Sequence, residues 1–139
     1  MTIEERVKIA YDTHHQGYNC AQAVFAAYLD ILGISKEDAM KTAYGFGGGV
    51  GMTREICGTL TGGAMVLGQK FGKEAADVKQ KQFVNQKVAA LCHEFEERHG
   101  SVICGELLGL RETDKQVQRK SCDELIEEVV RLLEKYVIE

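Results

Sequence analysis

Proline is absent from this chain of 139 residues, and so are the long apolar runs of membrane proteins. A membrane-spanning helix needs about 18 or more consecutive apolar residues, and no stretch of this chain approaches that length. Residues 1–6 lack the basic start and the apolar run of a secretory signal. We therefore expect a cytoplasmic protein with no membrane span.

A surplus of positive charge is also missing. The chain has 17 lysine and arginine residues against 21 aspartate and glutamate residues, which gives a formal net charge of −4. The basic residues are spread along the chain, and their densest cluster is only the pair Arg119 and Lys120. Because nucleic-acid binders usually carry a basic patch, we expect no nucleic-acid partner.

The alternation of apolar and polar residues that is typical of strands is scarce, whereas apolar residues recur at helical spacing along the whole chain. No linker, internal repeat or second core is visible. We predict an all-α fold in a single domain over residues 1–139, a helical bundle of about five to seven helices with a glycine-rich loop. The expected helices cover approximately residues 3–14, 20–31, 36–44, 53–67, 73–98, a short segment around 104–108, and 122–136.

Four of the five cysteines are expected near helix starts. Cys20 and Cys122 each directly follow a residue of the type that caps helices. Cys57 and Cys104 each lie within about one turn of such a residue, Thr53 and Ser101 respectively. Unpaired N–H groups and the helix dipole favour a thiolate there, so we expect a lowered cysteine pKa. Thiolates serve as nucleophiles, as partners in disulfide exchange and as metal ligands.

The fifth cysteine, Cys92, lies on the apolar stripe of the long helix expected over residues 73–98, where a cysteine behaves as a small hydrophobe. No Cys-x-x-Cys motif is present, so neither a zinc ribbon nor a thioredoxin-type site is indicated locally. Any site formed by the other four cysteines must be assembled by the fold, from different helices.

The glycine-rich stretch over residues 45–51 fits neither the dinucleotide fingerprint nor the P-loop pattern. We interpret the backbone N–H groups of Gly47, Gly48 and Gly49 as a candidate anion-binding nest for a cofactor, with a flexible loop as the equal alternative. Gly58 directly follows Cys57 and would leave room beside the sulfur, so it joins these three as a candidate cofactor-binding residue.

Histidines and acidic residues give weaker signals. His14 and His15 lie close in sequence to Cys20, and we interpret them as a polar helix end, with a role as base or additional ligand as the alternative. Glu94, Glu96 and Glu97 are typical of a solvated helix face.

Three stretches of the chain resemble a known family. They are CGTLTGGAM at residues 57–65, GYNCAQAV at 17–24, and GSVICGELLG at 100–109 followed by Cys122. They resemble the family that is named for the C-GCAxxG-C-C pattern and described as redox-active. The resemblance spans nearly the whole chain and implies a helical fold and a redox role for four cysteines, which fall on Cys20, Cys57, Cys104 and Cys122. The chain departs from the pattern at Ile56 and Gly58, which precede and follow the second cysteine, and at Thr59, which replaces the alanine.

Four hypotheses follow for Cys20, Cys57, Cys104 and Cys122. They hold an iron–sulfur cluster for electron transfer; they act as catalytic thiols in thiol–disulfide exchange; they bind a structural zinc ion in an interaction module; or they are inert. We rank the first two close together, the zinc site below them, and inert cysteines last. A redox partner protein is the expected partner in the redox cases, and a homodimer is an additional expectation.

Overall fold

The computed structural model describes residues 1–138. Within them the chain forms seven α-helices and two 3-10 helices and no strand, which confirms the predicted all-α fold. The only strand-like pairing in this part of the chain is an isolated antiparallel bridge between Ile56 and Ile103. The helices are α1 (Ile3–His15), α2 (Cys20–Ala26), η1 (Leu29–Ile31), α3 (Lys36–Ala43), η2 (Tyr44–Phe46), α4 (Gly58–Phe71), α5 (Val78–His99), α6 (Cys104–Leu107) and α7 (Cys122–Tyr136).

Side-chain capping fixes where several helices begin. Thr2, Asn19 and Ser121 each form a reciprocal capping box with the residue three positions later, at the starts of α1, α2 and α7. These bonds satisfy backbone N–H groups that a helix start leaves unpaired. Cys20 and Cys122 are therefore the first helical residues, as the sequence predicts.

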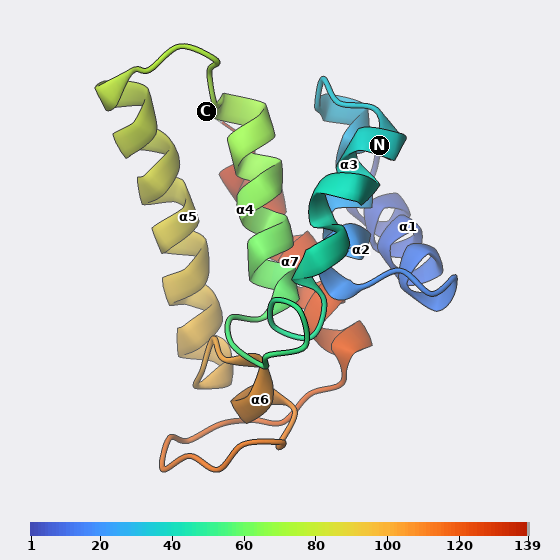
Figure 1. The fold of residues 1–139 in the computed structure, drawn as a ribbon, viewed down its shortest axis with the longest axis vertical. Coiled ribbons are helices and arrows are strands. Elements are labelled where there is room, and N and C mark those ends of the chain that lie inside the picture. Colours follow the sequence, from blue (N-terminus) through green and yellow to red (C-terminus); the bar gives the residue numbers. More distant parts are fainter. Residues whose placement is uncertain (139) are drawn as a thin grey trace.

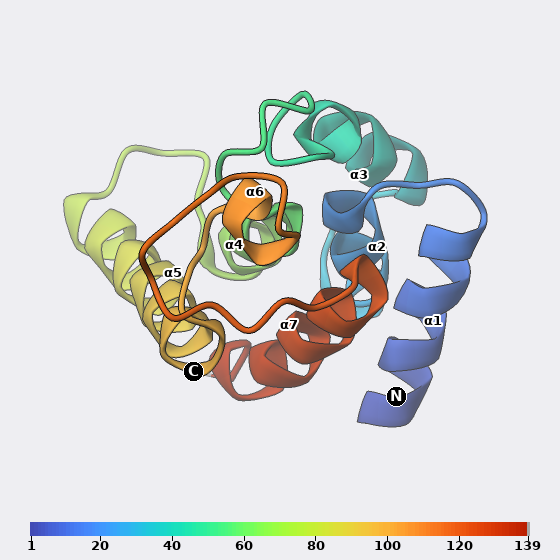
Figure 2. The same ribbon diagram turned by 90° about the horizontal axis from the view of Figure 1, so that it is seen from below.

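The short helix α2 lies at the centre of the bundle, between α1, α3, α4 and α7 (Figures 1 and 2). Its residues from Ala21 to Ala26 are all buried. Gly62 of α4 lets that helix approach closely, since a Cβ atom there would lie 2.7 Å from the Ala21 carbonyl oxygen. The hydroxyl of buried Tyr28 donates a hydrogen bond of 2.7 Å to the Val130 carbonyl, which joins the end of α2 to α7.

Three of the predicted helices have wrong boundaries. The helix expected over residues 20–31 ends at Ala26 and continues only as the 3-10 turn η1. The helix expected from residue 73 begins at Val78, because Asp77 caps it by accepting from the Gln80 N–H. The helix expected from residue 53 begins at Gly58, because the preceding backbone pairs instead with residues 102–104.

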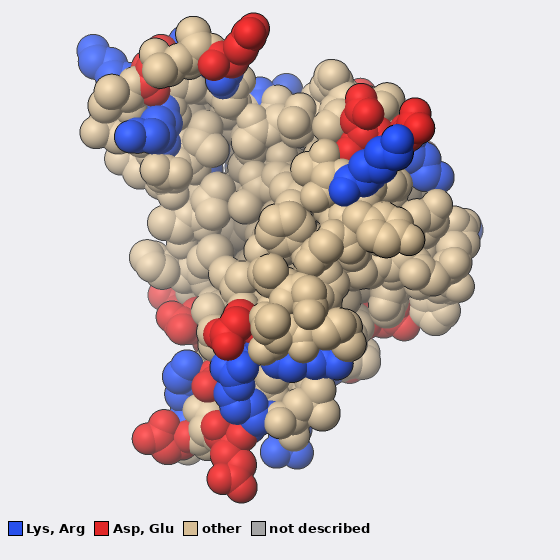
Figure 3. Space-filling view, in the orientation of Figure 1, with Lys and Arg blue, Asp and Glu red and all other residues tan. Residues whose placement is uncertain are grey.

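Charged side chains are unevenly distributed over the face drawn in Figure 3. They gather over the α4–α5 connection, over α3, and at the lower end around α6, while the surface over the middle of α4 and α5 carries few. Within residues 1–138, every helix is too short or too polar to cross a membrane.

Candidate four-cysteine site

Four of the five cysteines line one cavity of about 200 Å³. Each comes from the start of a different helix: Cys20 begins α2, Cys104 begins α6, Cys122 begins α7, and Cys57 directly precedes α4. These helix starts lie at the lower end of the bundle in Figure 1, beside the glycine-rich loop. The fold thus brings together the four cysteines that were expected near helix starts.

Cys57 and Cys104 are held next to each other by backbone pairing rather than by the caps that the sequence predicts. The Cys57 N–H donates to the Val102 carbonyl at 2.8 Å, and the Cys104 N–H donates to the Glu55 carbonyl at 2.6 Å. The expected caps are wrong: the residues at the cap positions are Cys57 itself and Ile103. The Thr53 hydroxyl instead donates to loop carbonyls, and the Ser101 hydroxyl instead donates to Glu106.

Cys92 lies elsewhere. It is half-buried on α5 and packs against the hydrophobic core, as the sequence predicts, and it does not line the cavity. Burial raises the pKa of its thiol, with a smaller contribution from the nearby Glu96 carboxylate. Cys92 therefore serves as a natural internal control for experiments on the other four cysteines.

The glycine-rich loop has an unusual backbone. Gly48, Gly49 and Gly51 have φ angles between 56° and 71°, and Val50, Met52 and Arg54 have φ angles of 68°, 64° and 63°. A left-handed conformation costs a non-glycine residue about 1–2 kcal/mol, so three of them in seven residues are a concentration of strain. Backbone hydrogen bonds of 2.9–3.0 Å from residues 51–55 back to residues 45–50 hold the loop in this form.

This loop forms one wall of the cavity, through Gly48, Gly49, Met52 and Arg54. A Cβ atom on Gly49 would lie 2.7 Å from the Cβ of Cys104, so only glycine fits there. Within residues 1–138, the N–H groups of Gly48 and Gly49 donate to no protein acceptor. Unpaired N–H groups of this kind form the anion-binding nests found at phosphate and iron–sulfur sites.

The other two glycines of the expected cofactor site differ in position. Gly58 lines the cavity, and a Cβ atom there would lie 3.3 Å from the Cβ of Cys20. Gly47 does not line the cavity; a Cβ atom there would lie 2.8 Å from the Cβ of Asn19. Gly47 therefore allows the loop to pack on the start of α2, which is a structural role rather than the expected cofactor-binding one.

The thiols of Cys20, Cys57 and Cys122 have pKa values shifted in different directions. The contact with the Cys20 thiol, together with the charges of His14 and Arg54, lowers the pKa of Cys122 to about 6. The same contact and burial raise the pKa of Cys20. Burial also raises the pKa of Cys57 to about 11, although the Thr59 hydroxyl, 3.0 Å from its sulfur, acts in the opposite direction.

The pKa of Cys122 is lowered, but by Cys20, His14 and Arg54 rather than by the helix start, and the expectation of a lowered pKa is wrong for Cys20 and Cys57. Desolvation, which penalises the charged thiolate, is the largest cause at Cys57, whereas at Cys20 the contact with Cys122 comes first and desolvation second. Cys20 also responds to the charges of Cys57 and Cys104, which raise its pKa further. The four sulfurs thus interact electrostatically, and a bound cation that offset their charge would change the protonation of all of them.

Sequence reasoning missed one polar residue of the cavity, Arg54, and gave His14 a role there only as the less favoured alternative. Arg54 lines it, and its guanidinium donates to the Cys104 sulfur at 3.7 Å. His14 also lines it from the end of α1, so the preferred interpretation of His14 as merely a polar helix end is incomplete. Neither residue is in a motif with a cysteine; only proximity in the folded chain links them.

Fold and site together define an all-helical protein with four cysteines gathered at helix starts. Over residues 18–136 the chain matches the family described as "Putative redox-active protein (C_GCAxxG_C_C)". The chain belongs to this family, which confirms the resemblance noted in its sequence. An uncharacterized protein of Archaeoglobus fulgidus is 31% identical over 122 residues, which are 82% of this chain and 81% of that protein. No solved structure matches the chain.

Proposed function

We propose that the four-cysteine site holds an iron–sulfur cluster through which the protein exchanges electrons with a redox partner protein. One observation carries the proposal: Cys20, Cys57, Cys104 and Cys122 line a single cavity from four different helix starts. Four thiolates are the usual ligand set of a two-iron or four-iron cluster. The family's description as redox-active agrees with this role.

The residues around the cysteines fit such a group. Gly49 and Gly58 keep the space beside Cys104 and Cys20 free of side chains. The unpaired N–H groups of the loop and the Arg54 guanidinium offer hydrogen bonds to sulfur, which stabilise its negative charge. Cys57 and Cys104 are only 4% and 7% exposed, whereas Cys20 and Cys122 are half-buried, so one side of the site is shielded from water.

The spacing of the sulfurs supports a cluster over a single zinc ion. Zinc–sulfur bonds of about 2.3 Å in a tetrahedron place all four sulfurs about 3.8 Å apart. Among residues 1–138, one group of three potential ligand atoms lies within 4.8 Å of one another. It consists of His14, His15 and Asp123 and includes no cysteine sulfur. A cluster of several iron atoms requires a wider set of sulfurs than one zinc ion does.

In this proposal the protein's own residues perform distinct tasks. The cysteines bind the group, the left-handed loop and α6 exclude water, and Arg54 and His14 place positive charge at the edge of the cavity. When bound, the cluster supplies reversible one-electron transfer. The protein sets the potential of that transfer through hydrogen bonds and burial.

The test is anaerobic reconstitution with ferrous iron and sulfide, followed by visible absorption and iron and sulfide analysis. We expect the wild-type protein to become brown and the Cys57→Ser variant to lose most of the bound iron. Cys92→Ser is the matched control, because Cys92 lies outside the cavity, and it should load like the wild type. Protein that stays colourless and iron-free contradicts the proposal, and so does equal loss of iron in both variants.

The contact between Cys20 and Cys122 favours thiol–disulfide exchange as a second candidate. A lowered pKa on one thiol beside a second thiol is the arrangement of a nucleophilic cysteine and its resolving partner. Mild oxidation of metal-free protein should then remove about two thiols per chain, and Cys122→Ser should prevent that loss. An unchanged thiol count contradicts this second candidate and leaves the cluster proposal standing.

A further inference from the structure

Outside the cysteine set, three potential metal ligands meet where the end of α1 lies against the start of α7. His14 Nδ1 is 2.7 Å from Asp123 Oδ1, and His15 Nε2 is 2.8 Å from Asp123 Oδ2. The three ligand atoms lie within 4.8 Å of one another. We propose that His14, His15 and Asp123 form a second metal site, which binds a divalent transition-metal ion such as zinc.

The fold holds these side chains in place. Asp123 lies in the first turn of α7, which the reciprocal capping box of Ser121 and Glu124 fixes. The His15 ring stacks on Tyr11, with ring centroids 4.0 Å apart and an angle of 23° between the ring planes. A ligand set whose backbone and rings are already positioned loses less conformational entropy when it binds an ion.

The donor chemistry identifies the class of ion. Two imidazole nitrogens and one carboxylate oxygen are a ligand set of zinc and of divalent iron, and they leave further coordination positions for water or a substrate. Calcium and magnesium prefer oxygen ligands alone, so they are poor candidates. The cysteine cavity offers soft thiolates instead, so the two sites differ in the metals that they favour.

Solvent can reach the site. The side chains of His14, His15 and Asp123 are 26%, 47% and 37% exposed. An ion with bonds of about 2.0–2.2 Å separates nitrogen and oxygen ligands by about 3.4 Å, so each present contact must open by about 0.6 Å. Rotation of these partly exposed side chains provides that movement without a change in the helices.

The experiment is a zinc titration of the full chain under anaerobic conditions, after the cysteine cavity has been filled with its cluster or with one equivalent of zinc. Zinc is the probe, isothermal calorimetry gives the stoichiometry, and ¹⁵N NMR of the imidazoles identifies the ligands. We expect one further zinc ion per chain, with shifts of the His14 and His15 rings. The exposed His93 on α5 should not shift.

Variants separate this site from the cavity. His15→Gln leaves the cavity lining intact and should weaken the additional zinc by about tenfold or more, as should Asp123→Asn. His93→Gln is the control and should bind like the wild type. Equal zinc binding by His15→Gln and wild type overturns the proposal, and so do equal shifts of all histidines. Because iron loading of the cysteines is measured separately by visible absorption, failure of one site does not imply failure of the other.

Discussion

Arg54 and Cys104 are joined by a hydrogen bond in which the guanidinium Nη1 lies 3.7 Å from the cysteine Sγ. The backbone of Arg54 itself is strained, because its φ angle is 63°. Its carbonyl also accepts from the Gly105 N–H at 3.1 Å, directly beside Cys104. Strain of this kind persists where the surrounding structure determines the conformation, and it is often found at functional sites.

The first prediction concerns the Arg54 side chain. In cluster-loaded protein, Arg54→Gln should lower the reduction potential by an amount on the order of 50 mV, because it removes a positive charge and a hydrogen bond that stabilise the reduced, more negative state. Potentiometric titration followed by visible absorption measures the change. Arg119→Gln, which does not line the cavity, is the control. An unchanged potential in Arg54→Gln would show that the contact with Cys104 has no electronic role.

A second prediction concerns Gly49. Gly49→Ala should lower the free energy of unfolding by about 2 kcal/mol or more, because alanine is disfavoured at a φ of 71° and its Cβ would lie 2.6 Å from the Glu55 nitrogen. Gly45→Ala is the matched control, since a Cβ atom there meets nothing within 4 Å. Urea denaturation measures both. If both variants unfold at the same urea concentration as wild type, the result contradicts the tight packing of the loop on Cys104.

Helix starts that depend on a local capping residue could be predicted from the sequence, and those that depend on distant contacts could not. Asn19 and Ser121 are strong capping residues, and α2 and α7 begin directly after them, at Cys20 and Cys122. The bridge between Ile56 and Ile103 joins residues far apart in the chain, so no local pattern could indicate that it replaces a helix start. The start of α4 was therefore misplaced by a few residues, and the cap of α6 was assigned to Ser101 instead of Ile103.

The same distinction applies to the candidate site. Cys20, Cys57, Cys104 and Cys122 could be selected from cap positions and from the family resemblance, because both are written in the sequence. Their acidities could not be predicted. The low pKa of Cys122 and the high pKa of Cys57 depend on contacts and burial that only the packed bundle creates.

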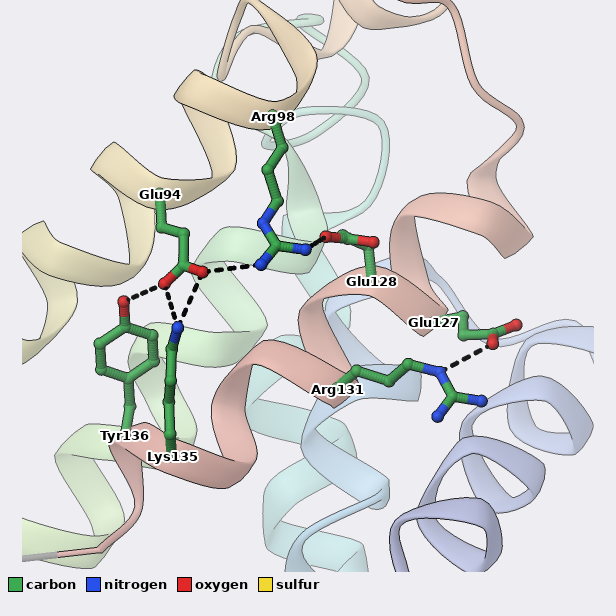
Figure 4. Close-up of polar contacts among 7 residues, drawn as sticks. All are labelled: Glu94, Arg98, Glu127, Glu128, Arg131, Lys135 and Tyr136. Carbon is green, nitrogen blue, oxygen red and sulfur yellow. Dashed lines mark hydrogen bonds and ion pairs between the residues drawn. The ribbon is translucent and has the colours of Figure 1, made fainter.

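Glu94 provides a third prediction and corrects the interpretation of its surroundings as a solvated face. Its side chain is only 20% exposed and accepts hydrogen bonds from Tyr136, Lys135 and Arg98 (Figure 4). The Lys135 contact, followed by the Tyr136 hydroxyl, lowers the pKa of Glu94 to about 2 from an ordinary value of 4.5. The network joins the C-terminal part of α5 to the end of α7.

A group with a lowered folded-state pKa contributes stability above its unfolded pKa and loses it as the pH falls through the folded value. Glu94→Gln should therefore cost about 1–2 kcal/mol at pH 7, a cost that shrinks between pH 4.5 and about 2. Urea denaturation at several pH values measures the cost. Glu97→Gln, on an exposed position of the same helix, is the control. A cost that does not depend on pH would mean that Glu94 acts through packing alone.

The last prediction concerns the order in which the cysteines react in reduced, metal-free protein. Cys122 is half-buried with a pKa lowered to about 6, whereas Cys57 is 4% exposed with a pKa raised to about 11. Because the thiolate is the nucleophile, iodoacetamide at pH 7.5 should modify Cys122 well before Cys57. The rate at Cys122 should rise with pH and level off above about pH 7, because the thiol is then largely ionised.

Mass spectrometry of peptides after timed quenching gives each rate. His14→Gln should move the midpoint of the Cys122 rate profile to higher pH, since the positive charge of His14 helps to stabilise the thiolate. Faster reaction at Cys57 than at Cys122, or a midpoint that does not move in His14→Gln, would contradict the charge arrangement on which the cavity's chemistry depends. Cys92, outside the cavity and with a pKa raised by burial, should react at the same rate in both proteins.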